Sequence, residues 1–303
     1  MSLIETIISN YQHRGLEPLL QIMPTDYCTI AAEAIMELPG KTILICTGFY
    51  SYGFGETDGP IGSFFLYAAL KKLGFEPVII TDSYNEVFFK QYQLNYELYN
   101  HTTYAKNILN KYQPSAIIAV ERCGRAADGT YYSMKGKNIS AFVSSMDDLF
   151  IQANCLTIGI GDGGNEIGMG KYYEELSATI PLIRSIIQTD YLITATVSNW
   201  GAYGLLAALS CITKINVLPS FMEVEEYLKF IVENGATDGF LGAKHLSVDG
   251  FDLSVEKEII ELLKNTCFGQ IYDHDLCIIF SNKSIDELKK TQPILISSHI
   301  DTV

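Results

Sequence analysis

The sequence has few basic residues: 21 Lys and Arg stand against 35 Asp and Glu, which gives a formal net charge of −14 over 303 residues. No basic stripe is present, so neither nucleic acid nor an anionic membrane is expected as a partner. The sequence also lacks an apolar run of the ~18 residues that indicate a membrane span, and residues 1–6 lack the basic start of a secretory signal. We therefore expect a cytoplasmic protein with no membrane partner.

Cysteine and histidine are too scattered to form a conventional catalytic or metal site. The seven cysteines are odd in number and widely spaced, so neither a disulfide framework nor a CxxC metal site is indicated. Cys123 alone lies beside charged residues, but no suitably spaced histidine completes a nucleophile pair, and we interpret this thiol as structural. The five histidines form no cluster, which argues against zinc.

The sequence does contain a series of short, β-rich apolar runs, at 42–47, 77–81, 116–120, 156–160 and 191–197. Short runs with little polar alternation indicate strands that are covered on both faces. Helical patterns follow them, at 61–73, 102–112, 201–213, 223–233 and 254–264. The sequence thus predicts an α/β fold with three layers: a mainly parallel sheet with crossover helices, Rossmann-like, and a ligand site at the carboxyl ends of the strands.

No low-complexity linker or repeat divides the chain, and a composition of 48% hydrophobic residues is sufficient for a large core. We predict one domain over residues 1–303. Within it, residues 1–40 form a helical cover, residues 41–218 an α/β core, and residues 219–303 further helices and a closing strand at 276–281.

Each predicted strand is followed by a loop rich in glycine and polar residues, and parallel strands place such loops at one edge of the sheet. The first loop, 48–59, fits neither the GxxxxGK[ST] nor the GxGxxG phosphate-binding pattern. Two interpretations stay open for it. It lines a pocket, with the helix after Pro60 offering N–H groups to an anion, or it is a long ordered turn with packed tyrosines.

The most informative stretch is GIGDGGNEIGMG at 159–170, directly after a predicted strand. Its glycines allow a backbone to approach a ligand closely. Glu166 lies four residues after Asp162 and would share its face if a helix starts near Gly164. Together with Asn165, these carboxylates offer oxygen ligands for Mg²⁺ or Mn²⁺, or an acid and base pair. Asp162 and Glu166 are thus candidate metal ligands; no other cofactor is indicated.

Basic residues are concentrated in one other strand-end loop, where Arg122 and Arg125 flank Cys123 and Lys135 follows. Guanidinium groups suit carboxylate or phosphate groups of a small anionic substrate. An alternative is an internal ion network in which the arginines neutralise Glu121 and Asp128.

At these residues the chain resembles a known family, the C-terminal domain of D-glutamate cyclase and its stand-alone microbial relatives. The resemblance covers most of the chain in order. Its motifs are Thr47-Gly48 with ETDGP at 56–60, ERCGR at 121–125 with DGTY at 128–131 and MKG at 134–136, GDGGNEIGMG at 161–170, SNWGA at 198–202, TDG at 237–239 and SVDG at 247–250. The animal members carry a further N-terminal domain that resembles a separate hydro-lyase family, which is not expected in this chain.

The resemblance implies cyclisation of D-glutamate to 5-oxo-D-proline with loss of water. On this hypothesis Arg122 and Arg125 clamp the substrate carboxylates, and Asp162 and Glu166 act as base and acid or hold a divalent ion. Asn199 and Thr47 orient the amine. The remaining candidates are Glu121, Asn165 and Asp128 in the catalytic group and Gly48, Asp58, Lys135, Gly163 and Gly164 in the substrate site.

Two alternatives remain open at this stage. One is a metal-dependent enzyme that acts on a small phosphorylated metabolite, since acidic and arginine loops also suit phosphate. The other is a non-catalytic protein that binds an amino acid or dicarboxylate. The sequence leaves the oligomeric state open, with a homodimer among the options.

Overall fold

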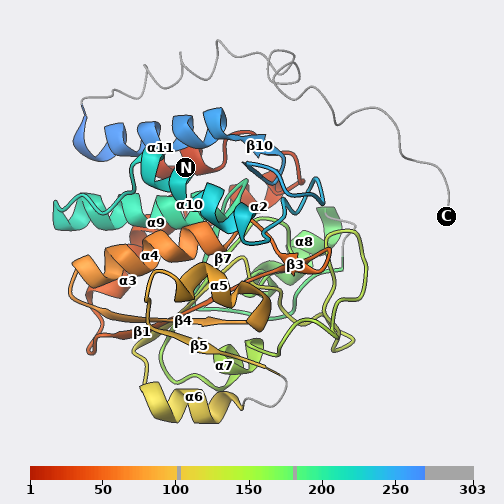
Figure 1. Cartoon of the computed structure of the whole chain (residues 1–303). Coiled ribbons are helices and arrows are strands. Elements are labelled where there is room, and N and C mark those ends of the chain that lie inside the picture. The colour runs from red at the N-terminus through yellow and green to blue at the C-terminus, as the bar shows by residue number, and fades with distance from the viewer. Residues whose placement is uncertain (101–103, 180–182, 270–303) are drawn as a thin grey trace.

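The computed structural model describes residues 1–100, 104–179 and 183–269. At its centre is a six-stranded parallel sheet with the strand order β5-β4-β1-β6-β7-β8 (Figure 1). The strands are β1 (Thr42–Thr47), β4 (Glu76–Thr81), β5 (Tyr96–Leu98), β6 (Ala116–Val120), β7 (Leu156–Gly161) and β8 (Tyr191–Thr194). The predicted α/β fold with a parallel sheet is therefore confirmed.

Helices cover both faces of this sheet. On one face lie α4 (Pro60–Lys72) and α9 (Ser198–Thr213), and on the other lie α6 (Ala105–Tyr112) and α7 (Asp147–Gln152) (Figure 1). Alternate residues of β1 explain why both faces are apolar: Ile43 and Ile45 join the core under α4 and α9, whereas Leu44 and Cys46 join the core under α6 and α7. Runs without polar alternation thus identified a doubly covered sheet correctly.

The remaining elements pack around this three-layer centre. Helix α9 is buried along most of its length because α1, α3, α4 and α11 pack on it, and α3 also lies against β8. The other elements are α1 (Leu3–Ile8), α2 (Glu17–Ile22), α3 (Tyr27–Met36), β2 (Tyr50–Ser51), β3 (Phe54–Gly55), η1 (Ser83–Asn85), α5 (Glu86–Lys90), η2 (Gly170–Tyr172), α8 (Tyr173–Thr179), α10 (Phe221–Glu233), β9 (Ser247–Val248), β10 (Phe251–Asp252) and α11 (Leu253–Phe268).

Two sequence predictions differ from the structure near the sheet. The predicted strand at 191–197 was too long, because β8 ends at Thr194 and the chain then turns into α9 at Ser198. The edge strand β5 was missed, since its three residues are only half-buried and carry no apolar run. The predicted closing strand at 276–281 lies outside the described residues. Within the described part of the chain, no helix is long and apolar enough to cross a membrane.

Candidate active site

The strand order places a crevice at the carboxyl ends of β1 and β6. From β1 the chain moves outward to β4 and β5, and it then returns to the other side of β1 to form β6, β7 and β8. The loops that follow β1 and β6 therefore diverge in opposite directions. In open α/β sheets such a switch point is where ligands bind.

Three buried carboxylates from three different loops meet at this crevice, and we call Asp58, Glu121 and Asp162 the acidic cluster. One oxygen of each lies within 4.8 Å of the others. Glu121 and Asp162 are the first residues after β6 and β7, and Asp58 lies just before α4. The expected convergence of strand-end loops is confirmed for these residues.

Burial and mutual repulsion shape the acid–base behaviour of the acidic cluster. Burial raises the pKa of all three carboxyl groups well above the ordinary values, and neighbouring carboxylates raise them further. Only Asp162 has a cation in direct contact, since the Arg14 guanidinium lies 2.5 Å from its Oδ1 and opposes the rise in pKa. Buried carboxyl groups with perturbed pKa values in a crevice are a common mark of acid–base catalysis.

Asp58 is held in place by the start of α9. Its Oδ1 accepts hydrogen bonds from the N–H groups of Gly59 (2.9 Å) and Asn199 (2.7 Å), and its Oδ2 accepts one from the N–H of Ser198 (2.9 Å). The N–H groups in the first turn of a helix have no acceptor within the helix, and the N-cap residue of α9 provides none. The carboxylate of Asp58 accepts their hydrogen bonds instead. The positive ends of two helix dipoles, those of α4 and α9, consequently point at the cluster.

Asn199 does not reach toward a substrate, contrary to expectation. Its Oδ1 accepts hydrogen bonds from the N–H groups of Gly59 (2.9 Å) and Gly62 (2.7 Å), and its Nδ2 donates to the carbonyl of Thr57 (3.2 Å). The side chain is fully buried. It ties the beginning of α4 to the beginning of α9, and we interpret it as a positioning residue.

Glu166 was expected to share a helix face with Asp162, and this was wrong. Residues 162–169 form a loop, and the first helical turn after β7 is η2. Glu166 folds back so that its Oε1 accepts from the N–H of Gly163 (2.9 Å) and its Oε2 from the N–H of Gly164 (2.7 Å). Both glycine N–H groups are therefore occupied, and Glu166 acts as a clamp for the loop that carries Asp162.

The two arginines also depart from the expected substrate clamp. Arg122 is fully buried and binds the carbonyls of Gly48 (2.8 Å) and Ser144 (2.6 Å) as well as the carboxylate of Asp82. It joins the loops that follow β1, β4 and β6. The alternative of an internal ion network therefore accounts for Arg122, although its acidic partner is Asp82 rather than Glu121.

Arg125 and Asp128 lie outside the crevice. Arg125 pairs with Asp147 (2.9 Å) and Asp148 (2.6 Å) at the start of α7. Asp128 is exposed, and its carboxylate accepts hydrogen bonds from Thr130 and from the Tyr132 hydroxyl (2.5 Å) in its own turn, which lowers its pKa to about 2. A carboxylate held ionised at the surface is a poor proton carrier, so we no longer assign it a catalytic role.

Asn165 and Thr47 differ in how their polar atoms are used. The Asn165 Nδ2 donates to the carbonyl of Tyr132 (2.9 Å), which fixes the loop beside the cluster. The Thr47 hydroxyl is buried at the end of β1 and has no hydrogen-bond partner. A Cβ built on Gly59 would lie 3.1 Å from this hydroxyl and 2.8 Å from the Glu121 Cβ, so Thr47 and Glu121 flank the same narrow space.

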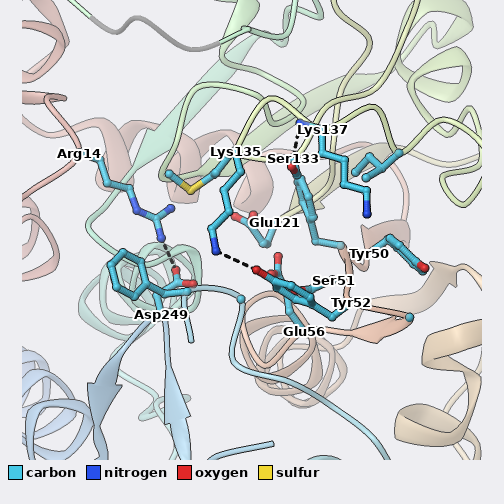
Figure 2. A pocket seen from close by; sticks show the side chains of 16 residues that line it. Arg14, Tyr50, Ser51, Tyr52, Glu56, Glu121, Ser133, Lys135, Lys137 and Asp249 are labelled. Atoms are coloured by element: carbon cyan, nitrogen blue, oxygen red, sulfur yellow. Dashed lines mark hydrogen bonds and ion pairs between the residues drawn. The ribbon is translucent and has the colours of Figure 1, made fainter. Parts of the chain in front are cut away.

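A cavity of about 420 Å³ opens beside the cluster and is lined by Glu121. Figure 2 shows Arg14 paired with Asp249 on one side and Lys135 extending to the hydroxyl of Tyr52, 2.8 Å away. Lys137 and Glu56 also line the cavity. Of the three basic residues expected to bind the substrate, Lys135 lines this cavity, whereas Arg122 and Arg125 do not.

Sequence reasoning missed three residues of the site: Arg14, Glu56 and Asp249. Arg14 bridges Asp162 (2.5 Å) and Asp249 (2.9 Å) from the loop between α1 and α2, a segment interpreted only as helical cover. Asp249 has a φ of +51° in the tight turn between β9 and β10. The SVDG motif at 247–250 and the ETDGP motif at 56–60 carried a signal for Asp249 and Glu56, whereas Arg14 had none.

Comparisons with known proteins identify the family of the chain. Residues 3–264 match the family described as D-glutamate cyclase-like, C-terminal. The mitochondrial D-glutamate cyclase of Homo sapiens is 29% identical over 293 residues, an alignment that covers 76% of this chain and 46% of the human protein. The chain thus spans less than half the length of that relative. Because the family match extends over most of the chain, the chain belongs to the D-glutamate cyclase-like C-terminal family.

Proposed function

We propose that the chain converts D-glutamate to 5-oxo-D-proline and water in the cavity beside the acidic cluster. The observation that carries this proposal is a group of buried carboxyl groups with raised pKa values next to a cavity lined by lysines. The similarity to human D-glutamate cyclase supports the choice of substrate.

The reaction requires two proton movements at one place. The substrate ammonium loses protons so that its nitrogen can attack the γ-carboxyl carbon, and one γ-carboxyl oxygen leaves as water after protonation. A carboxylate that is stabilised by a cation suits the removal of protons from the ammonium group. A carboxyl group that stays protonated near neutral pH suits the protonation of the leaving oxygen. Burial raises the pKa of the carboxyl groups in the acidic cluster, and one of them, Asp162, lies against the Arg14 guanidinium.

For a reaction without a metal ion, we assign the general acid to Glu121 and the general base to Asp162. Glu121 lines the cavity, and its Oε2 accepts a hydrogen bond from the Ser198 hydroxyl (2.5 Å). Burial and the neighbouring carboxylates raise its pKa, which favours the protonated form. Asp162 contacts Arg14, which favours its ionised form relative to Glu121.

The lysines of the cavity fit the two carboxylates of the substrate. Lys135 and Lys137 both line the cavity, and the Lys135 ammonium lies over the ring of Tyr52 at 5.4 Å. Neither lysine has an acidic partner in the ion pairs of the described residues, so both are available to an anion. We therefore place the α-carboxylate of the substrate at the lysine side and the γ-carboxyl group at the acidic side.

The test is the rate of 5-oxoproline formation from D-glutamate and from L-glutamate, with Mg²⁺, Mn²⁺ or EDTA. We expect turnover of D-glutamate, and we expect Glu121→Gln to lower kcat/KM by about 100-fold or more, as is usual when a general acid is lost. The matched control is Glu225→Gln on α10, where the carboxylate pairs only with Lys229 at the surface. Absence of turnover under every condition overturns the proposal, and glutamate binding without consumption supports the amino-acid-binding alternative.

A further inference from the structure

The acidic cluster contains more negative charge than the neighbouring side chains compensate. Besides the cluster residues Asp58, Glu121 and Asp162, four further carboxylates lie close enough to influence members of this group: Glu56, Glu166, Asp238 and Asp249. Among the ion pairs of the described residues, Arg14 alone compensates this group, and it does so at Asp162 and Asp249. Burying such an excess of like charge is costly unless protons or a cation offset it.

Within the described residues, three buried oxygen atoms at this point have no partner. One is the Oδ2 of Asp162, whose Oδ1 alone is bound by Arg14. The second is the hydroxyl of Thr47, which faces the space between Gly59 and Glu121, and the third is the Oδ1 of Asn165, beside Gly163. Buried polar atoms are nearly always satisfied in folded proteins, so unsatisfied oxygens at the same crevice indicate a ligand that accepts lone pairs.

The spacing of the acidic cluster suits a small divalent cation. Magnesium ions bind oxygens at about 2.0–2.1 Å and calcium ions at about 2.3–2.6 Å, so two ligands on opposite sides of an ion are separated by roughly 4–5 Å. The three carboxylate oxygens lie within 4.8 Å of one another. Small movements of the three side chains would therefore bring these oxygens to coordination distance of one ion.

Each member of the cluster keeps a lone pair for this purpose. The Oδ2 of Asp58 accepts a single hydrogen bond, from Ser198, and the Oδ2 of Asp162 accepts none. Glu121 uses its Oε2 to accept from Ser198, and its side chain reaches the cavity. Carboxylate oxygens with free lone pairs and a hydroxyl are the ligands that Mg²⁺ and Mn²⁺ prefer.

We propose that Asp58, Glu121 and Asp162 bind one divalent cation of the Mg²⁺ or Mn²⁺ class, with the Thr47 hydroxyl as a further oxygen donor. Glu166, expected from the sequence to be a ligand, is left out of this ligand set because its carboxylate holds the N–H groups of Gly163 and Gly164 and is not among the three whose oxygens meet within 4.8 Å. The site itself rests on the geometry of the cluster.

The use of this cation rests on the proposed function. A glutamate molecule carries one net negative charge near neutral pH, and the cluster would repel its γ-carboxylate. A divalent cation held there would offset part of this negative charge, offer the γ-carboxylate a positive partner and make its carbon more electrophilic. With the ion bound, Glu121 and Asp162 orient it, and the protons of the reaction then pass through other groups or water. This outcome is distinguishable from the metal-free mechanism by the effect of EDTA on turnover.

The experiment is a titration of the EDTA-treated full chain with Mn²⁺, in which the free ion is measured by electron paramagnetic resonance. We expect one tight site per chain, from which Mg²⁺ displaces Mn²⁺. Glu121→Gln should weaken binding about tenfold or more, a loss in the range seen when groups that support a metal site are removed. Glu225→Gln on α10 should bind as the unchanged chain does.

A second variant, Thr47→Val, keeps the proposal testable if Glu121→Gln does not fold. Circular dichroism checks the fold of both variants. Thr47→Val keeps the shape of the side chain and removes a hydroxyl that no protein group uses, so it should fold and bind Mn²⁺ several-fold more weakly. The proposal is overturned if the unchanged chain binds no Mn²⁺, if Glu225→Gln weakens binding as much as Glu121→Gln, or if both site variants bind as tightly as the unchanged chain. If the chain turns over D-glutamate in EDTA and binds no Mn²⁺, the cation site is overturned and the cyclase proposal stands. If the chain binds Mn²⁺ but turns over no D-glutamate, the cyclase proposal is overturned and the cation site stands.

Discussion

Arg14 and Asp162 are separated by 148 positions in the sequence, yet the guanidinium Nη1 of Arg14 lies 2.5 Å from the Oδ1 of Asp162. The same guanidinium reaches Asp249 at 2.9 Å through Nη2. The segment before α2 and the turn between β9 and β10 are thereby joined to the carboxyl end of β7. Residues outside the α/β centre thus complete the site.

Replacing Arg14 with methionine should destabilise the chain strongly. The substitution leaves Asp162 and Asp249 buried without a cation, and removal of one partner of a buried ion pair typically costs about 3–5 kcal/mol. Urea denaturation followed by circular dichroism measures the change in the free energy of unfolding. The control is Lys229→Met, which removes a partly exposed pair with Glu225 and should cost about 0.5 kcal/mol or less. Equal losses for both variants would contradict the assigned role of Arg14.

Cys211 should be an unusually reactive thiol. The Cys267 Sγ lies 2.9 Å from the Cys211 Sγ, and this hydrogen bond lowers the pKa of Cys211 to about 7. Burial raises the pKa of Cys46 to about 12 instead. We expect alkylation of Cys211 by iodoacetamide to rise with a midpoint near pH 7, while Cys46 stays unmodified until the chain unfolds. Mass spectrometry of the labelled peptides checks both, and Cys267→Ala, which removes the hydrogen-bond donor, should return the Cys211 midpoint to the ordinary range of thiols.

The sequence was sufficient to predict most of the sheet and the edge of the sheet where the strand-end loops meet, because both depend on local patterns. Apolar runs without alternation identified β1 and β6 with their observed bounds, and the parallel arrangement then fixed the edge where loops converge. The acids that directly follow a strand, Glu121 and Asp162, were placed correctly for this reason. Their position depends only on where the strand ends.

The roles of individual polar side chains could not be predicted, because they depend on which distant group each side chain meets. Two nearby arginines are typical of a site that binds substrate carboxylates. Their spacing in the sequence does not reveal that Arg122 forms an ion pair with Asp82 and Arg125 one with Asp147. Glu166 is four residues from Asp162, but a glycine-rich loop does not follow helical periodicity. Arg14 lies in a segment whose only visible signal is helical.

The acidic cluster should make stability depend on pH in the direction opposite to that of paired surface carboxylates. Burial raises the pKa of Glu121 well above its ordinary value of 4.5. Above pH 4.5 the unfolded chain therefore loses this proton while the folded chain keeps it, so stability falls as the pH rises toward the raised pKa. In EDTA, we expect the melting temperature to decrease between pH 5 and pH 8, as scanning calorimetry would show.

Glu121→Gln removes this titrating group and tests the assignment. Its melting temperature should vary less over the same pH interval than that of the unchanged chain, whereas Glu225→Gln should leave the pH profile as it is. A saturating divalent cation should also flatten the profile, because a bound ion stabilises the ionised carboxylates of the folded chain. An identical slope in Glu121→Gln and the unchanged chain would show that Glu121 is not the group responsible.

Thr47→Val should separate the stability of the empty site from its affinity for a cation. The buried hydroxyl of Thr47 has no partner, and leaving such a group unsatisfied typically costs about 1–3 kcal/mol, so its replacement by a methyl group should stabilise the chain in EDTA. With Mn²⁺ present the order should reverse, because the variant has lost an oxygen ligand. Thermal unfolding of both chains with and without the ion measures this crossover. A hydroxyl with a purely structural role would give the same difference in melting temperature in both conditions, and that result would remove Thr47 from the proposed ligand set.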